Sequence, residues 1–265
     1  MTAILDQVLA DLTAEGDALA AVVAPLDESG WRTPVPAEGW DIATTIVHLA
    51  WTDECAIAAG TDKAAWDALV LNAIEDPEGF VDAEAYAGAK ATGAEIQARW
   101  QASRPALVAM LRGYPAGEKL PWFGPPMSPA SMGTARFMET WAHALDVYDA
   151  LGLTYRPTDR LRHVAHLGVR TRNFAFGVQG LEPPAAEFRV VLTAPSGAEW
   201  AWGPDDASQS VVGSAYDFCL RVTQRRHRHD LDLVATGRDA DRWLDIAQAF
   251  AGPAGPGREP VVGDG

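Results

Sequence analysis

The chain has 265 residues, of which 48% are hydrophobic and 22% are charged, and its formal net charge is −15. This length predicts two domains or one large one, and the composition is typical of a soluble globular protein. No apolar run approaches the roughly 18 residues of a membrane span, and the negative charge, unrelieved by any stripe of Lys and Arg, disfavours partners such as nucleic acid or an anionic membrane.

The N-terminal segment and the two cysteines predict a cytoplasmic protein. The first residues, MTAILDQVLADLTAEGD, have no basic stretch ahead of an apolar core, so they do not look like a signal peptide. Cys55 and Cys219 lie far apart and form no Cys-x-x-Cys pair, which fits a reducing compartment and argues against a disulfide framework or a thiolate zinc site. We expect both to be small core residues.

The first part of the chain has the periodicity of helices, interrupted by segments rich in Pro and Gly. Asp41 is placed to cap one helix that Gly60 closes, and Pro105 should kink or break another. The helices predicted here span about 2–24, 42–59, 62–74 and 82–112.

The next helix has clear signals at both ends. Ser128 followed by Pro129 marks its start, and Gly152 marks its end. Together with the earlier segments it makes four main helices with long connections, which predict a four-helix bundle over residues 1–155.

After a further helix at about 157–178, the pattern changes to that of strands. The segments EFRVVLTAP, AEWAWG and SQSVVG are rich in Val, Trp and Phe and are separated by Pro and Gly turns, so they predict an antiparallel sheet. A helix at about 213–225, a strand in HDLDLVATG and a helix at about 239–251 follow. We therefore expect a two-domain α+β protein, with a smaller α+β domain over 156–251 and a flexible tail over 252–265.

The segment FMETWAHALDVYDALG carries a polar stripe along one side of its helix. At about 100° per residue, Glu139, His143 and Asp146 share one side with Arg136, and the aromatic residues occupy the opposite side. Two interpretations fit this pattern. The stripe is either a solvent-exposed set of ion pairs, with Arg136 paired to Glu139, or it faces a cavity in which Glu139 and His143 bind the same metal.

A catalytic zinc site needs a third protein ligand, and the candidate is His48. On its helix His48 lies off the centre of the aliphatic stripe, beside Thr44 and Thr52. A position that flanks the core of a bundle is where a ligand from a neighbouring helix would lie.

The remaining histidines give weaker evidence of a metal site, and the common catalytic motifs are absent. His163 and His166 have no third ligand in their flanks, and His227 and His229 lie in RRHRHD, which is typical of a solvated basic turn. The sequence contains no phosphate-binding glycine loop, no Gly-x-Ser-x-Gly and no His-Glu-x-x-His.

Two segments together resemble the mycothiol-dependent maleylpyruvate isomerase family, within the DinB/YfiT-like superfamily of metal-binding four-helix bundles. GWRTPVPAEGWDIATTIVHLA looks like the family's Trp-x-x-Pro-Thr-Pro-x-x-x-Trp pattern followed by His-Leu, with Thr33 before Pro34 instead of after it. RFMETWAHALDVYDALG is similar to its Arg-x-x-Glu-x-x-x-His-x-x-Asp helix. This likeness covers 1–155, and a looser likeness to the family's sterol-carrier-like C-terminal domain covers 185–251.

The resemblance implies that His48, Glu139 and His143 bind a divalent metal, usually zinc. It also points to Arg225, in LRVTQRR where relatives show Leu-Thr-Gly-Arg, as a catalytic arginine that clamps a substrate carboxylate. Gln224 stands in place of the family's glycine.

Further roles follow as hypotheses around this centre. Asp146 or Asp53 would orient a ligand imidazole, and Trp122 and Phe123 would wall the site. Each has a plainer alternative, as a surface charge or as a core aromatic.

The implied function is that of a zinc-dependent thiol transferase or cis-trans isomerase, which activates a low-molecular-weight thiol, with mycothiol as the family's thiol, against a small electrophilic substrate. The expected partners are these two small molecules, and the chain would act as a monomer or homodimer. The alternatives are a metal-binding module without thiol chemistry and a hydrolase that uses zinc-bound water.

Overall fold

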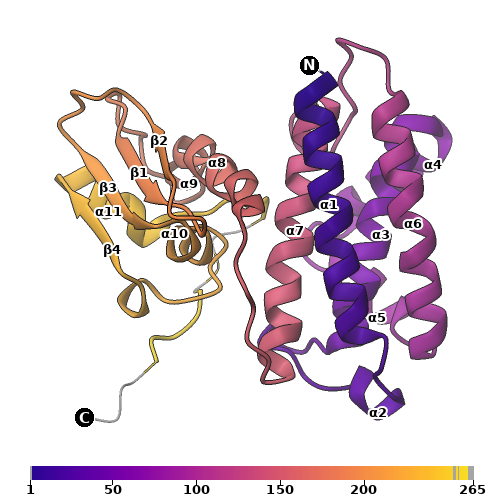
Figure 1. Ribbon diagram of the computed structural model, residues 1–265. Helices are drawn as coiled ribbons and strands as arrows, with labels where there is room; N and C mark the ends of the chain where they lie inside the picture. The colour runs from indigo at the N-terminus through magenta and orange to yellow at the C-terminus, as the bar shows by residue number, and fades with distance from the viewer. Residues whose placement is uncertain (1, 253–254, 256, 262–265) are drawn as a thin grey trace. The chain divides into compact units, whose positions relative to one another are not determined.

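The computed structural model describes residues 2–252, 255 and 257–261, and the chain divides into two compact units, Met1–Thr154 and Tyr155–Gly265 (Figure 1). The first unit is helical and the second combines helices with a four-stranded sheet, so the predicted mixed α+β class is confirmed. Separate domains at 1–155 and 156–251 stay a prediction, and the predicted flexible tail at 252–265 lies partly outside the described residues. None of the described helices is long and apolar enough to cross a membrane.

The first unit is built around four long helices, α1, α3, α6 and α7, which have 20 to 22 residues each and run side by side (Figure 1). The helices of this unit are α1 (Thr2–Val23), α2 (Glu28–Trp31), α3 (Ile42–Thr61), α4 (Lys63–Glu75), α5 (Phe80–Gly88), α6 (Gly93–Gly113) and α7 (Pro129–Ala150).

The ends of α3 and α7 follow the capping chemistry that the sequence predicts. The Asp41 and Ser128 side chains each accept a hydrogen bond from a backbone N–H in the first turn of their helix, and Pro129 occupies the first position of α7. After α7, Gly152 has φ of +63°, a conformation that glycine adopts without strain. These caps fix where the two helices begin.

Other predicted helix limits are wrong. α3 runs through Gly60 to Thr61, so this glycine does not end the helix. A Cβ at Gly60 would lie only 2.5 Å from Met110 Sδ, so the glycine permits close packing against α6. The single helix expected over 82–112 is two helices, since Thr92 and Glu95 form a capping box that starts α6 afresh. α6 then continues past Pro105 without a break.

The second unit holds a sheet with strand order β2-β1-β3-β4. Its elements are η1 (Asp159–Leu161), α8 (Arg162–Arg170), α9 (Arg172–Val178), β1 (Arg189–Thr193), β2 (Glu199–Trp202), β3 (Ser210–Ser214), α10 (Ala215–Val222), η2 (Arg228–Asp230), β4 (Leu233–Thr236) and α11 (Arg238–Ile246). The expected helix at 157–178 is therefore divided between α8 and α9.

The sheet is mixed, which corrects the prediction of an antiparallel sheet. β1 pairs antiparallel with β2, and β3 with β4, but the central pair, β1 and β3, is parallel. A turn through Gly197 places β2 on one edge of β1, and the chain then returns to the other edge, where β3 runs in the direction of β1. Strand propensity identifies the segments but does not specify this crossing.

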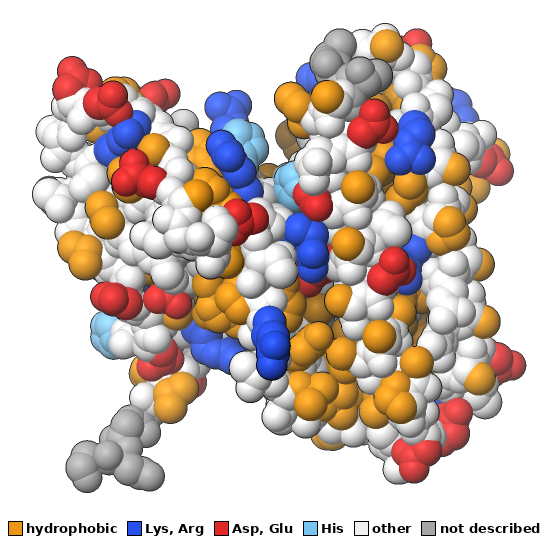
Figure 2. Space-filling view, viewed as in Figure 1, with side chains coloured by type: hydrophobic (Ala, Val, Ile, Leu, Met, Phe, Trp, Pro, Cys, Tyr) orange, Lys and Arg blue, Asp and Glu red, His pale blue; other side chains and the backbone are white. Residues whose placement is uncertain are grey.

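The interior of the first unit is mainly apolar, with a few polar side chains on α3 and α7. Large side chains that are almost fully buried include Leu9, Leu19, Ile42, Ile46, Leu49, Ile96, Trp100, Leu107, Phe137 and Trp141. On the visible face of this unit, acidic and basic side chains are scattered among hydrophobic and uncharged ones (Figure 2). Among the described residues of this unit, the buried acidic and basic side chains are Glu15 on α1, His48 and Asp53 on α3, and Arg136 and Asp146 on α7, so four of the five belong to α3 and α7.

Both cysteines are buried, as predicted. Burial raises the pKa of Cys55 to about 12 and raises that of Cys219 well above its ordinary value. Their thiols are therefore neutral at physiological pH, and neither is an activated nucleophile.

Candidate metal centre

Three side chains from α3 and α7 converge inside the helical unit. His48 Nε2 lies 3.6 Å from Glu139 Oε2, and His143 Nε2 lies 3.4 Å from the same oxygen. One ligand atom from each of the three residues lies within 4.8 Å of the others. Within the described residues this is the one group of His, Cys, Asp and Glu that is close enough to hold a metal ion.

The distances and the donor set fit a divalent cation. Tetrahedral zinc with bonds of about 2.0 to 2.2 Å holds neighbouring donor atoms about 3.3 Å apart, close to the two separations found around Glu139 Oε2. Two imidazoles and one carboxylate suit zinc and other first-row divalent metals, and three protein ligands leave a coordination position open.

Burial sets the protonation states of these groups. The side chains of His48, Glu139 and His143 are 11%, 25% and 12% exposed. Burial lowers the pKa of His48 to about 4, against the opposing influence of Glu139, so its imidazole is neutral at physiological pH. For Glu139, burial acts to raise the pKa, but hydrogen bonds and charge from His143 and His48 hold it well below the ordinary value. His48 and Glu139 therefore have the protonation states that metal binding requires.

A second carboxylate contacts one of the imidazoles from behind. Asp146 Oδ2 lies 3.3 Å from His143 Nδ1, and its side chain is 2% exposed. This contact is an ion pair and does not have the geometry of a hydrogen bond. Carboxylates beside the second nitrogen of a ligand histidine are the usual groups that orient such a ring, so the orienting role of Asp146 stays a prediction. Asp53, the alternative for this role, is paired with Arg136 at 3.0 Å. Arg136 therefore does not form the exposed pair with Glu139 that one interpretation of the polar stripe required.

Trp40 covers the two imidazoles, a contact that was not predicted. Its ring stacks on His143 with a centroid distance of 5.8 Å and an interplanar angle of 12°, and it lies 5.2 Å from the ring of His48. Its Nε1 donates a hydrogen bond to Asp82 Oδ1, which holds the ring in place. The signals in the sequence were the position of Trp40 directly before the Asp41 cap of α3 and its place as the second Trp of the family pattern, neither of which indicates stacking on the imidazoles.

The loop aromatics Trp122 and Phe123, which we expected to wall the site, lie in a separate aromatic cluster. Phe123 contacts Phe80 at 5.4 Å, Phe80 contacts Trp51 at 5.0 Å, and Trp51 lies 6.4 Å from His48. Two rings thus separate the loop from His48. Phe123 is 40% exposed and Trp122 is partly buried, so neither is a fully buried core residue.

Arg225 belongs to the second unit, and its catalytic role stays a prediction. Its guanidinium donates a hydrogen bond to the Thr223 carbonyl, just after α10. The preceding Gln224 has φ of +57° and is the one non-glycine residue with positive φ in the described chain. The Arg225 N–H bonds to the Leu220 carbonyl, so the turn has the helix-ending geometry that normally uses glycine at this position.

The other histidines have different partners. His166 Nδ1 accepts a hydrogen bond from Trp202 Nε1, and His227 Nδ1 accepts one from the backbone N–H of His229. The ranges 2–252, 255 and 257–261 contain no further cluster of metal-ligating groups that includes these side chains or His163.

Fold and site together define a mixed α+β protein with a two-histidine, one-carboxylate centre in its helical unit. The family model described as the mycothiol maleylpyruvate isomerase N-terminal domain matches residues 12–148, more than half of the chain, and the chain belongs to that family. A second model, described as wyosine base formation, matches residues 184–236.

The chain is also similar to two curated proteins and to two solved structures. Two uncharacterized proteins from strains of Mycobacterium tuberculosis are each 56% identical over 250 residues, covering 94% of this chain and 97% of theirs. The crystal structure of the mycothiol-dependent maleylpyruvate isomerase matches with a TM-score of 0.58 at 15% identity, over 87% of this chain and 92% of that one. A histidine-to-alanine mutant of that enzyme matches with the same TM-score at 16% identity. These two structures show that the fold is shared.

Proposed function

We propose that this protein is a zinc-dependent enzyme, or one using another divalent metal, that activates a low-molecular-weight thiol for transfer to, or cis-trans isomerisation of, a small electrophilic substrate. Mycothiol is the expected thiol, because it is named in the family and in the structural relatives. The observation that carries the proposal is the convergence of His48 Nε2 and His143 Nε2 on one carboxylate oxygen of Glu139.

Each residue of the centre has a role that follows from its contacts. His48, His143 and Glu139 hold the cation, Asp146 orients the His143 ring, and Trp40 shields both imidazoles from water. A bound divalent cation supplies Lewis acidity, which lowers the pKa of a thiol or water molecule beside it. Because the protein contributes only one negative charge to the ligand set, the centre keeps a net positive charge that favours the anionic form of a thiol.

The remaining finer points belong to the same proposal. The four long helices correspond to a DinB/YfiT-like four-helix bundle, and the second unit to a sterol-carrier-like domain. Arg225 would bind a carboxylate of the electrophile by a charge-assisted hydrogen bond.

The test is a reaction of the zinc-loaded protein with mycothiol and a panel of small electrophiles that includes maleylpyruvate, followed by chromatography and mass spectrometry. The wild type should give a thiol adduct or a cis-trans isomer only when the thiol is present. His48→Ala should abolish the reaction, and His166→Ala, in the second unit, should leave it unchanged.

Two other results would replace the proposal. Metal-dependent hydrolysis without any thiol requirement would identify a hydrolase. A protein that binds zinc tightly but converts no member of the panel, with or without mycothiol, would be a metal-binding module.

A further inference from the structure

Close to the metal centre, a buried ion pair connects the same two helices. Arg136 of α7 and Asp53 of α3 are 2% and 4% exposed, and Arg136 Nε lies 3.0 Å from Asp53 Oδ1. The Arg136 guanidinium also reaches the backbone carbonyl of Leu49 at 3.4 Å, and Ser103 of α6 donates to the second carboxylate oxygen of Asp53 at 3.4 Å. One side chain of α7 is thus bonded to α3 at two points.

Both points lie on α3 directly after the ligand that this helix supplies. Leu49 follows His48 directly, and Asp53 lies about one turn further on. On α7, Arg136 precedes Glu139 by three residues, so the two lie on the same face about 4.5 Å apart along the axis. Because His48 is the only ligand on α3, it meets Glu139 only when α3 and α7 are aligned along their length.

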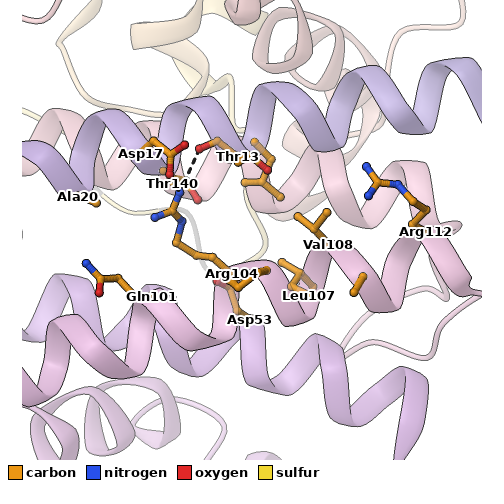
Figure 3. A pocket seen from close by; sticks show the side chains of 14 residues that line it. Thr13, Asp17, Ala20, Asp53, Gln101, Arg104, Leu107, Val108, Arg112 and Thr140 are labelled. Atoms are coloured by element: carbon orange, nitrogen blue, oxygen red, sulfur yellow. Dashed lines mark hydrogen bonds and ion pairs between the residues drawn. The ribbon is translucent and has the colours of Figure 1, made fainter.

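The ion pair is not fully enclosed by apolar side chains. A cavity of about 640 Å³ between α1 and α6 has Asp53 and Thr140 among its lining residues, and Arg104 extends across it to Asp17 and to the Thr13 carbonyl of α1 (Figure 3). A cavity of this size with polar groups in its wall has room for water that can meet the remaining hydrogen-bond capacity of the carboxylate.

A contribution to the stability of the fold is a weak explanation for a buried ion pair. Removing two charges from water costs most of what their attraction returns, so replacing a buried pair by apolar side chains is often neutral or stabilising. A planar guanidinium fork bonded to a carboxylate and a carbonyl is strongly directional, whereas apolar contacts tolerate sliding of one helix along another.

We propose that Asp53 and Arg136 are positioning residues of the metal centre: they hold α3 and α7 in the register at which His48 meets Glu139 and His143. This inference rests on the proposed metal-binding function. It assigns no contact with metal or substrate to either residue.

The test compares two double variants that each replace one ion pair by apolar side chains. Arg136→Met with Asp53→Val removes the positioning pair, and Arg104→Met with Asp17→Val removes a pair that joins α6 to α1 at the same cavity. For each protein we would measure the zinc dissociation constant by competition with a chelator, the visible absorption spectrum of the Co²⁺-loaded form, and the melting temperature without metal.

Loss of the positioning pair should lower the affinity for zinc but leave the stability of the metal-free protein almost unchanged. Its double variant should lose about ten- to hundredfold in zinc affinity, the range found when groups that orient metal ligands are removed. Its Co²⁺ spectrum should change, while its melting temperature without metal stays within a few degrees of the wild type. The Arg104 and Asp17 variant should keep the zinc affinity within about twofold and the wild-type spectrum.

Wild-type zinc affinity and spectrum in the Arg136 and Asp53 variant would overturn the inference. Should that double variant fail to fold, Arg136→Lys provides the test, because lysine keeps the positive charge but lacks the planar guanidinium fork. This variant should bind zinc more weakly than the wild type. Equal zinc binding would overturn the inference. A wild-type protein that binds no zinc or Co²⁺ would instead refute the proposed function itself.

Discussion

Both units carry a pair of possible metal ligands about one helical turn apart, Glu139 and His143 in the first and His163 and His166 in the second, but the surroundings of their histidines differ. In the helical unit, His48 and His143 are nearly buried and both face the Glu139 carboxylate. In the second unit, His166 is exposed and bonded to Trp202, and His227 bonds to the backbone of its own turn. Spacing along one helix therefore does not identify a metal site. Convergence of a second helix, together with burial that keeps the imidazole neutral, distinguishes the candidate centre.

The largest loss of zinc affinity should come from removing the carboxylate of Glu139, which both imidazoles face. Structural zinc sites bind with about 10 to 16 kcal/mol over four ligands, or about 3 kcal/mol for each. Glu139→Gln should therefore weaken zinc binding by more than about a hundredfold. His163→Ala, in the second unit, should leave the zinc affinity unchanged. Chelator competition measures both constants, and an equal loss in the two variants would remove the distinction between the units.

Acid should destabilise the metal-free protein through His48. The pKa of about 4 in the folded protein lies below the ordinary histidine value of 6.5, so the unfolded chain binds more protons between these values. The free energy of unfolding should therefore fall as the pH drops through this window, by up to about 3 kcal/mol. Urea titrations with excess chelator, compared with His48→Gln, measure this contribution. The same pH slope in both proteins would show that the imidazole is not held neutral.

A smaller effect should follow the loss of the carboxylate behind His143. Asp146→Asn keeps the size of the side chain but weakens the contact that fixes the ring, so zinc affinity should fall about tenfold. Asp67→Asn, on the exposed side of α4, is the matched control and should leave the affinity unaltered. Unchanged binding in Asp146→Asn would mean that the ring is oriented by its other neighbours.

The smallest predicted effect is on the stability of the second unit, and it should leave zinc binding unchanged. The left-handed conformation at Gln224 costs a non-glycine residue about 1 to 2 kcal/mol, and the greater freedom of glycine in the unfolded chain offsets part of this. Gln224→Gly should stabilise the protein by about 0.5 kcal/mol, while Gln224→Ala should give no gain. Urea denaturation would measure both, and destabilisation by glycine would show that the Gln224 side chain makes a contact of its own.

Local chemistry made much of the fold predictable. Asp41, Ser128 and Gly152 each act within one helical turn, so their neighbours along the chain suffice to assign them. The capping box of Thr92 and Glu95 was equally local but was hidden inside a helical pattern that continues on both sides. The parallel pairing of β1 and β3 depends on where a loop carries the chain, which strand patterns do not encode.

The three candidate ligands were predictable from the sequence, but the contacts around them were not. The spacing of Glu139 and His143 and the resemblance around His48 identified three residues that the structure brings together. The partner of Arg136 stayed open in the sequence: Glu139 lies three residues away on the same helix, whereas Asp53, more than eighty residues away, becomes a neighbour only through tertiary packing. Trp40 was missed because stacking on His143 depends on the packing of a loop against two helices.

The most direct measurement is the metal content of the purified protein. Wild-type chain and His48→Ala would be equilibrated with zinc, dialysed, and analysed by inductively coupled plasma mass spectrometry. We predict one zinc ion per wild-type chain and almost none in the variant, with both proteins folded by circular dichroism. Equal zinc content in the two folded proteins would contradict the assignment of His48, Glu139 and His143 as a metal centre.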